Sequence, residues 1–226
     1  MLSSFAGGSV TLHAMSSSTS LLLAALSLVA PASAVAQRAA THFVRSDTLP
    51  RLEIDVSANF AWLGDITFPV DTVATAREVI YGIADDGVLV RALIIHFEHF
   101  LPGQPHTFNY PPLPTVSLGG QEYLHQTWAF ADLDLFHQPE LVVVLEKLYL
   151  QVGTRWVMDR YVRVVPENPQ YEAIIFYLES DFVSDPSITY GGMPVAPPPP
   201  PVPPPAIAAD IAQRAQEAFT ILPPRP

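Results

Sequence analysis

Alternating hydrophobic and polar residues predict that the central part of the chain is built mainly of β-strands. Residues 53–60 alternate strictly, with apolar side chains on one face and polar side chains on the other, as in a half-buried strand. Residues 77–83 and 88–100 are two further β-rich runs, and the Asp85-Asp86-Gly87 segment between them suits a tight hairpin turn. The run 88–100 is apolar on both faces, which predicts a central strand of the sheet.

The second half of this region predicts one helix among further strands. Pro139 suits the first turn of a helix whose apolar residues recur at spacings of three and four, and Gly153 is placed to end it. Three consecutive valines, 142–144, make a strand the alternative there. Residues 122–128, 154–165 and 171–179 favour strands. We therefore expect an α+β fold: a curved antiparallel sheet with one main packed helix, with a half-closed barrel as the alternative.

The first 36 residues predict a secretory signal peptide. They contain no Asp, Glu, Lys or Arg, and residues 21–30 form an apolar run that is followed by small residues. This pattern predicts cleavage after Ala34 or Ala36 and a periplasmic or secreted protein. A retained anchor is the alternative, but the run is shorter than the roughly 20 residues that span a bilayer. After cleavage we expect no transmembrane span.

The C-terminal region has a different composition from the centre. Residues 186–205 are rich in proline, which predicts an extended linker. Residues 206–222 carry an apolar stripe at helical spacing, so residues 206–226 are expected to form a short amphipathic helix and tail. That stripe packs either on the chain's own core or on another protein or membrane surface. Residues 37–185 are then a single globular domain.

Charge and cysteine content exclude several classes of protein. The 226-residue chain has 22 acidic and 11 basic residues and a formal net charge of −11, which disfavours nucleic acid as a partner. It has no cysteine, which excludes disulfides, cysteine-ligated metal centres and a thiol nucleophile. Hydrophobic residues make up 49 % of the chain, enough to build a substantial core.

The segment 94–106 contains the most suggestive polar residues. On a strand, His96 and Glu98 share one face and His99 lies on the other. Two such ligands begin a metal site, for which His106, His125 or Glu122 would have to supply a third. The established metal-binding spacings are missing, so no metal or other cofactor is assigned and a metal remains the alternative to hydrogen-bonded histidines.

Two further features suggest ligand binding. Residues 101–116 form a proline-rich loop that also contains His106, Phe108 and Tyr110, and a pre-ordered aromatic loop makes a good binding rim. Arg160 interrupts an otherwise apolar face of the strand 154–165. We expect this guanidinium either to pair with Glu98 or a sheet neighbour, or to hold an anionic ligand.

These observations favour an exported protein that binds a small molecule or acts as an accessory domain of the cell envelope. The candidate ligand-binding residues are His96, Glu98, His99, His106, Phe108, Tyr110 and Arg160. One alternative is an interaction protein that docks an envelope partner through its proline-rich tail and terminal helix. The other is an enzyme that depends on His96 and Glu98, with or without a metal. No catalytic residue, ligand identity or oligomeric state follows from the sequence, and the balance of evidence is against catalysis.

Overall fold

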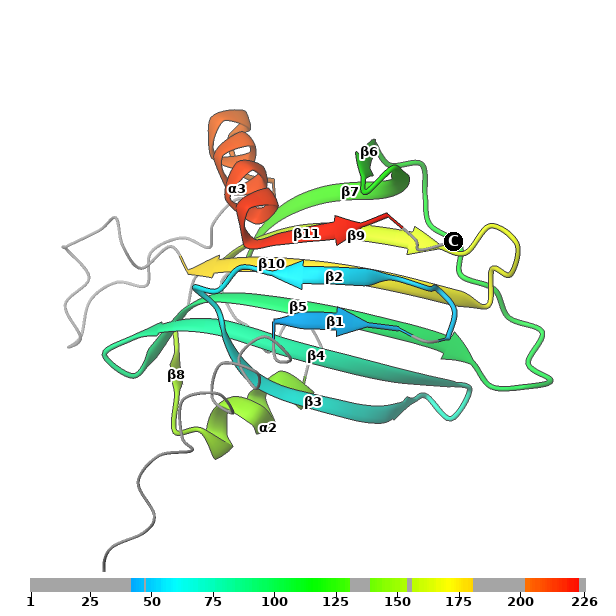
Figure 1. The fold of residues 1–226 in the computed structure, drawn as a ribbon, viewed down its shortest axis with the longest axis horizontal. Helices are drawn as coiled ribbons and strands as arrows, with labels where there is room; N and C mark the ends of the chain where they lie inside the picture. Colours follow the sequence, from blue (N-terminus) through cyan, green and yellow to red (C-terminus); the bar gives the residue numbers. More distant parts are fainter. Residues whose placement is uncertain (1–41, 47, 131–138, 154–155, 181–201, 224–226) are drawn as a thin grey trace, which may run out of the picture.

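The structure is a computed structural model that describes residues 42–46, 48–130, 139–153, 156–180 and 202–223 (Figure 1). The predicted signal peptide and most of the predicted proline-rich linker lie outside the described residues. Within these residues, no helix combines the length and the apolar character needed to cross a membrane.

Most of the described chain belongs to one large sheet of eight strands. Seven of them follow the order β3-β4-β5-β10-β9-β7-β6 and pair antiparallel, and the short β8 pairs parallel with β5. The strands are β3 (Ala61–Val70), β4 (Ala74–Asp85), β5 (Val88–Phe100), β6 (Thr115–Leu118), β7 (Gln121–Phe130), β8 (Gln151–Val152), β9 (Trp156–Val164) and β10 (Tyr171–Ser180). As predicted from its two apolar faces, β5 lies inside the sheet, between β4 and β10.

A second sheet joins strands from the two ends of the described chain. It has the order β1-β2-β11, with β1 (Phe43–Arg45), β2 (Glu53–Val56) and β11 (Phe219–Leu222), all antiparallel. The prediction of one strand over 53–60 was too long. The strand ends at Val56 because Phe60 N–H donates to the Ser57 carbonyl in a turn, after which the chain crosses to β3 in the large sheet.

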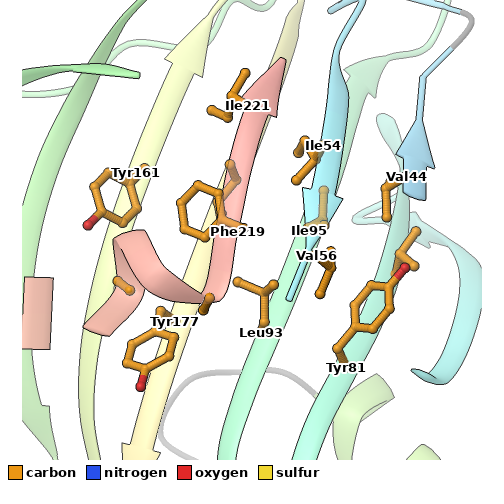
Figure 2. Packing of buried hydrophobic residues seen from close by; sticks show 14 of the residues in the cluster. Val44, Ile54, Val56, Tyr81, Leu93, Ile95, Tyr161, Tyr177, Phe219 and Ile221 are labelled. Carbon is orange, nitrogen blue, oxygen red and sulfur yellow. The ribbon is translucent and has the colours of Figure 1, made fainter. Parts of the chain in front are cut away.

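The small sheet covers one face of the large sheet, which we call the small-sheet face. Figure 1 shows β1, β2 and β11 in front of the large sheet, and Figure 2 shows their apolar side chains meeting those of β4, β5, β9 and β10. Ile54 of β2, Leu93 of β5 and Tyr161 of β9 are fully buried in this layer. Burial of this apolar surface is the main stabilising contribution on this side of the molecule.

The helix α2 (Pro139–Lys147) packs on the opposite face of the large sheet, which we call the α2 face. Leu141 and Leu145 are buried there against residues such as Ile94. The prediction that the helix continues to Gly153 was wrong. Tyr149 has a positive φ of 56° just after the helix, and the chain then forms β8 beside the start of β5.

The predicted hairpin at Asp86-Gly87 is confirmed, and it contains one irregularity. Both turn residues have positive φ, as a tight hairpin turn requires. Asp85 pairs with Val88 at the turn, but Ile83 pairs with Arg91, so one extra residue of β5 forms a β-bulge. The bulge shifts the register of all later pairs of this hairpin by one residue.

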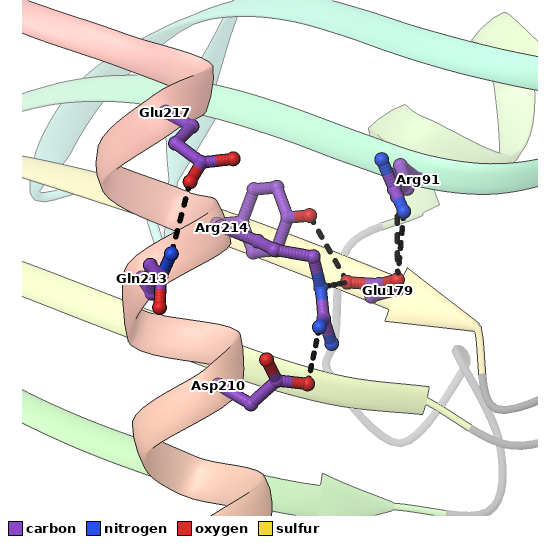
Figure 3. Close-up of polar contacts among 7 residues, drawn as sticks. Arg91, Glu179, Asp210, Gln213, Arg214 and Glu217 are labelled. Carbon is purple, nitrogen blue, oxygen red and sulfur yellow. Dashed lines mark hydrogen bonds and ion pairs between the residues drawn. The ribbon is translucent and has the colours of Figure 1, made fainter.

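The C-terminal helix packs on the chain's own core. The helix α3 (Pro205–Ala218) buries Ile211 and Ala215 against the small-sheet face. The prediction of a helix as far as residue 222 was too long, because residues 219–222 form β11 and pair with β2. Figure 3 shows that Arg214 of α3 also binds Glu179 of β10, with 2.7 Å between Nε and Oε2.

The α+β class predicted from the sequence is supported by this architecture. Both main sheets are antiparallel, neither closes into a barrel, and the described residues contain two helices. The proline-rich loop after β5 crosses the ends of β10 and β9 on its way to β6. Phe108 N–H donates to the Pro169 carbonyl in the turn between β9 and β10.

A substitution in α3 tests how much the packing of this helix contributes to stability. Ile211→Ala should lower the free energy of unfolding by about 2–5 kcal/mol, because it leaves a cavity under the helix. Ile207→Ala is the matched control in the same helix, since Ile207 is 46 % exposed, and it should change stability by less than about 0.5 kcal/mol. Urea denaturation followed by circular dichroism measures both. Equal effects of the two substitutions would show that α3 does not pack as described.

Candidate functional site

Six polar side chains gather on the α2 face beside the area that α2 covers. We call them the polar cluster: Glu78, His96, Glu98, Tyr110, Arg160 and Glu172. Strand pairing brings most of them together, because Glu78 of β4 lies opposite His96 of β5, and Glu98 of β5 lies opposite Glu172 of β10. Directly opposed residues of antiparallel strands share a face and have Cβ atoms about 5 Å apart.

His96 lies between two carboxylates. Its Nδ1 is 2.9 Å from Glu78 Oε1 and its Nε2 is 3.0 Å from Glu98 Oε2. Burial lowers the pKa of the ring, but hydrogen bonds to the two glutamates and their negative charges outweigh burial and raise the pKa of His96 to about 9. His96 is therefore an imidazolium at neutral pH and donates an N–H to each carboxylate.

Glu172 is the most unusual carboxyl group of the cluster. It is only 2 % exposed, and it accepts a hydrogen bond of 2.7 Å from the Tyr110 hydroxyl. Burial, together with the charge of Glu98, raises the pKa of Glu172 to about 7, against the effects of Tyr110, His96 and Arg160. This carboxyl group is poised to gain or lose a proton near neutral pH.

Arg160 lies beside two aromatic rings and has no ion-pair partner among the described residues. Its guanidinium carbon is 4.4 Å from the ring centre of Trp128 and 5.5 Å from that of Tyr110. Its one hydrogen bond is a long one, 3.5 Å from Nη2 to the neutral Gln126 side chain, and its buried Nε has no partner in the described part of the chain. Of the expected partners, Glu98 forms no ion pair with this guanidinium, whereas Gln126 is the sheet neighbour directly opposite Arg160. Burial lowers the pKa of this guanidinium, which nevertheless stays charged.

Two other arginines of the described residues have carboxylate partners. Arg77 contacts Asp65 with both Nε and Nη2, and Arg214 contacts Glu179 and Asp210. Arg160 has aromatic neighbours and one neutral amide where Arg77 and Arg214 have carboxylates. A half-buried guanidinium of this kind gains free energy when an anion binds it.

Three candidate residues from the sequence lie outside the polar cluster. His99 is on the small-sheet face, where its ring stacks on Tyr171 with 5.4 Å between centres. Phe108 and His106 both pack on Phe100 at the end of β5, with ring centres 4.5 Å and 5.6 Å away. Phe108 and His106 therefore hold the proline-rich loop against the sheet. Tyr110, the third candidate residue of this loop, is the one that reaches the polar cluster.

Of the four weak candidates for metal binding, the structure brings together His96 and Glu98, and it places His106 and His125 elsewhere. His125 lies on the small-sheet face, and its Nε2 is 2.7 Å from Asp159 Oδ1. Thr127 and Tyr161 also donate to Asp159, so that this fully buried carboxylate has its hydrogen bonds within the protein. Across the described residues, no three His, Asp or Glu side chains form a group that could hold a metal ion.

Two hollows lie between β1 and the strands β3 and β4. Their volumes are about 350 and about 400 Å³, and Arg45 and Arg77 line both. Arg77 pairs there with Asp65, and the hollow of about 350 Å³ is also lined by Glu98 and His99 of β5. The polar cluster, with its unpaired cation, is the stronger candidate site.

The sequence analysis found His96, Glu98, Tyr110 and Arg160 but missed their partners. Glu78 and Glu172 each interrupt an apolar strand, as Arg160 does, and that signal could have marked them. Gln126 and Trp128 lie on β7 at positions paired with Arg160 and Met158. Only knowledge of which strands pair could have placed these two residues near Arg160.

Comparisons of the chain with protein-family models, with curated proteins and with solved structures find no match.

The charge state of His96 gives a prediction about stability and pH. The pKa of His96 rises from 6.5 to about 9 on folding. The charged ring therefore adds to the free energy of unfolding below pH 6.5, and this contribution, about 3 kcal/mol at most, is lost as pH rises to 9. The pKa of Glu172 rises from 4.5 to about 7, which adds a decline in stability between these two values. The free energy of unfolding, measured by urea denaturation, should fall from pH 6 to pH 9.

Two measurements check the assignment to these residues. The decline above pH 7 should be smaller in His96→Gln, and the decline below pH 7 should be smaller in Glu172→Gln. An NMR titration of the His96 ring in the unmodified protein is the direct control. A midpoint below pH 7 for this ring would contradict the described hydrogen bonds.

Proposed function

We propose that this protein is exported to the periplasm or beyond and binds a small organic molecule on the α2 face of its large sheet, at the polar cluster. The single observation that carries the proposal is Arg160, a half-buried cation with aromatic neighbours and no anionic partner among the described residues. Ligand sites are typically apolar and aromatic surfaces with a few well-placed polar groups, and the surroundings of Arg160 have this composition.

The proposal of export rests on the sequence of the first 36 residues. Their uncharged start, apolar run and small residues before Ala34 and Ala36 are typical of a cleaved signal peptide.

The alternative of a docking protein has less support. It was motivated by the apolar stripe of the C-terminal helix, and α3 buries Ile211, Ala215 and Ala218 of that stripe against its own core.

The enzyme alternative also has less support. An imidazolium that donates both of its N–H groups to carboxylates has no lone pair with which to accept a proton. His96 is therefore better suited to neutralise Glu78 and Glu98 than to act as a general base.

Native mass spectrometry tests the proposal. The mature chain, from about Gln37, is purified from an exporting host, and its mass is compared with those of Arg160→Gln and Arg163→Gln. Arg163 lies on the same strand but on the small-sheet face, so its substitution is a matched control for the loss of one positive charge. The expected result is an organic mass bound to the unmodified protein and to Arg163→Gln, with occupancy about tenfold lower in Arg160→Gln.

A screen by thermal shift complements the mass measurement. A bound small molecule should raise the unfolding temperature of the unmodified protein and of Arg163→Gln more than that of Arg160→Gln. A chain that carries no organic mass and that no compound in a broad metabolite set stabilises would contradict the proposed function. Equal behaviour of the two arginine variants would contradict the location of the site.

A further inference from the structure

We infer that the ligand is an organic carboxylate with an apolar body, held by Arg160, and that it binds together with one proton at Glu172. The inference rests on the proposed function and names the class of ligand for the same site.

The anionic group follows from the environment of Arg160. The guanidinium has five N–H donors, and the hydrogen bond to Gln126 uses one of them over 3.5 Å. Guanidinium and carboxylate groups match in geometry and form two parallel hydrogen bonds. The guanidinium lies over the rings of Trp128 and Tyr110. A planar anion would therefore approach the edge of the guanidinium, where its N–H groups point.

The charge of the cluster favours an anion with a single charge. His96 neutralises one of its two glutamates, and Glu98 and Glu172 face each other on adjacent strands. Two or more negative charges on the ligand would be repelled by these carboxyl groups. A carboxylate carries one charge, whereas a phosphate monoester carries nearly two at neutral pH.

The apolar body follows from the residues around the guanidinium. Tyr110, Leu124 and Trp128 are all partly exposed and pack against the hydrophobic cluster of the α2 face. They come from the proline-rich loop and from β7, so they flank Arg160 on the side away from α2. An aromatic ring or a short aliphatic chain that contacts them would be removed from water.

The proton follows from the position of Glu172. The charged and titratable groups that act on it are Glu98 and His96 of β5, Arg160 of β9 and Tyr110 of the loop. An ionised Glu172 attracts Arg160 and repels a second carboxylate, so an anion at Arg160 favours the protonated form of Glu172. The complex then gains one ligand anion from solution and one proton from the buffer, and its net charge does not change.

The experiment is isothermal titration calorimetry of the unmodified protein with phenylacetate and hexanoate. Phenylacetamide and phenethylamine are the neutral and cationic counterparts of phenylacetate. Titrations at pH 6, 7 and 8 in two buffers with different enthalpies of ionisation measure the number of protons taken up. We expect binding of the carboxylates with close to one proton taken up at pH 8 and little uptake at pH 6. The affinity should fall about fivefold between pH 7 and pH 8, because the pKa of Glu172 is about 7.

Variants separate the two parts of the inference. Arg160→Gln should lower carboxylate affinity about tenfold or more, and Arg163→Gln should leave it unchanged. Glu172→Gln should bind phenylacetate with no proton uptake and with equal affinity at pH 6 and pH 8. Carboxylate binding without proton uptake in the unmodified protein would overturn the role of Glu172.

The neutral and cationic counterparts of phenylacetate test whether the ligand is a carboxylate. Binding of phenylacetamide or phenethylamine as tightly as phenylacetate would overturn the carboxylate while leaving the proposed function in place. If neither carboxylate binds, the organic mass carried by the purified protein decides. A carboxylic acid identified by fragmentation supports the inference, and any other compound overturns it. A protein with neither probe binding nor a bound organic mass contradicts the proposed function itself.

Discussion

Burial of both faces of the large sheet is the constraint that governs this structure. Leu93 and Ile95 point to one side of β5 and Ile94 to the other, and all are fully buried. One sheet face is covered by the small sheet and by α3, whose apolar residues form one buried cluster with those of the large sheet. The other is covered by α2, a helix of 9 residues, and by the loop after β5. Polar side chains gather on the second face, where the helical cover gives way to the loop, so the candidate site lies at the limit of the hydrophobic core.

The candidate site depends on a balance between charge and burial. A charged group is costly to bury, and the cluster limits this cost by pairing His96 with Glu78 and Glu98. The other two groups are less completely paired. Glu172 has a hydrogen bond from the Tyr110 hydroxyl, and Arg160 has the faces of aromatic rings beside it. Incomplete pairing costs stability in the free protein, and a ligand that completes it regains that stability on binding. Such local sacrifices are expected at functional sites more than in the rest of a fold.

Much of the fold could be predicted from short-range patterns in the sequence, and the errors have physical causes. The hairpin at Asp86-Gly87 and the central place of β5 followed from turn chemistry and from hydrophobicity. The partner of His96 could not be found in this way. A regular hairpin with this turn would place Glu78 opposite Ile95, on the other face, and the bulge near Ile83 shifts it to His96. Phe219–Leu222 looked helical because its apolar spacing continues that of α3, but pairing with β2 outweighs this local preference.

The small sheet has a consequence for how the protein is made. Its middle strand, β2, comprises residues 53–56, yet one of its two neighbours is β11, which comprises residues 219–222. During synthesis on the ribosome, Ile54 and Val56 therefore lack their partners Ile221 and Phe219 until residues 219–222 have been made. Contacts between such distant segments form late and slow the folding reaction. Until β11 has been made, the layer between the two sheets is therefore incomplete on one side of β2.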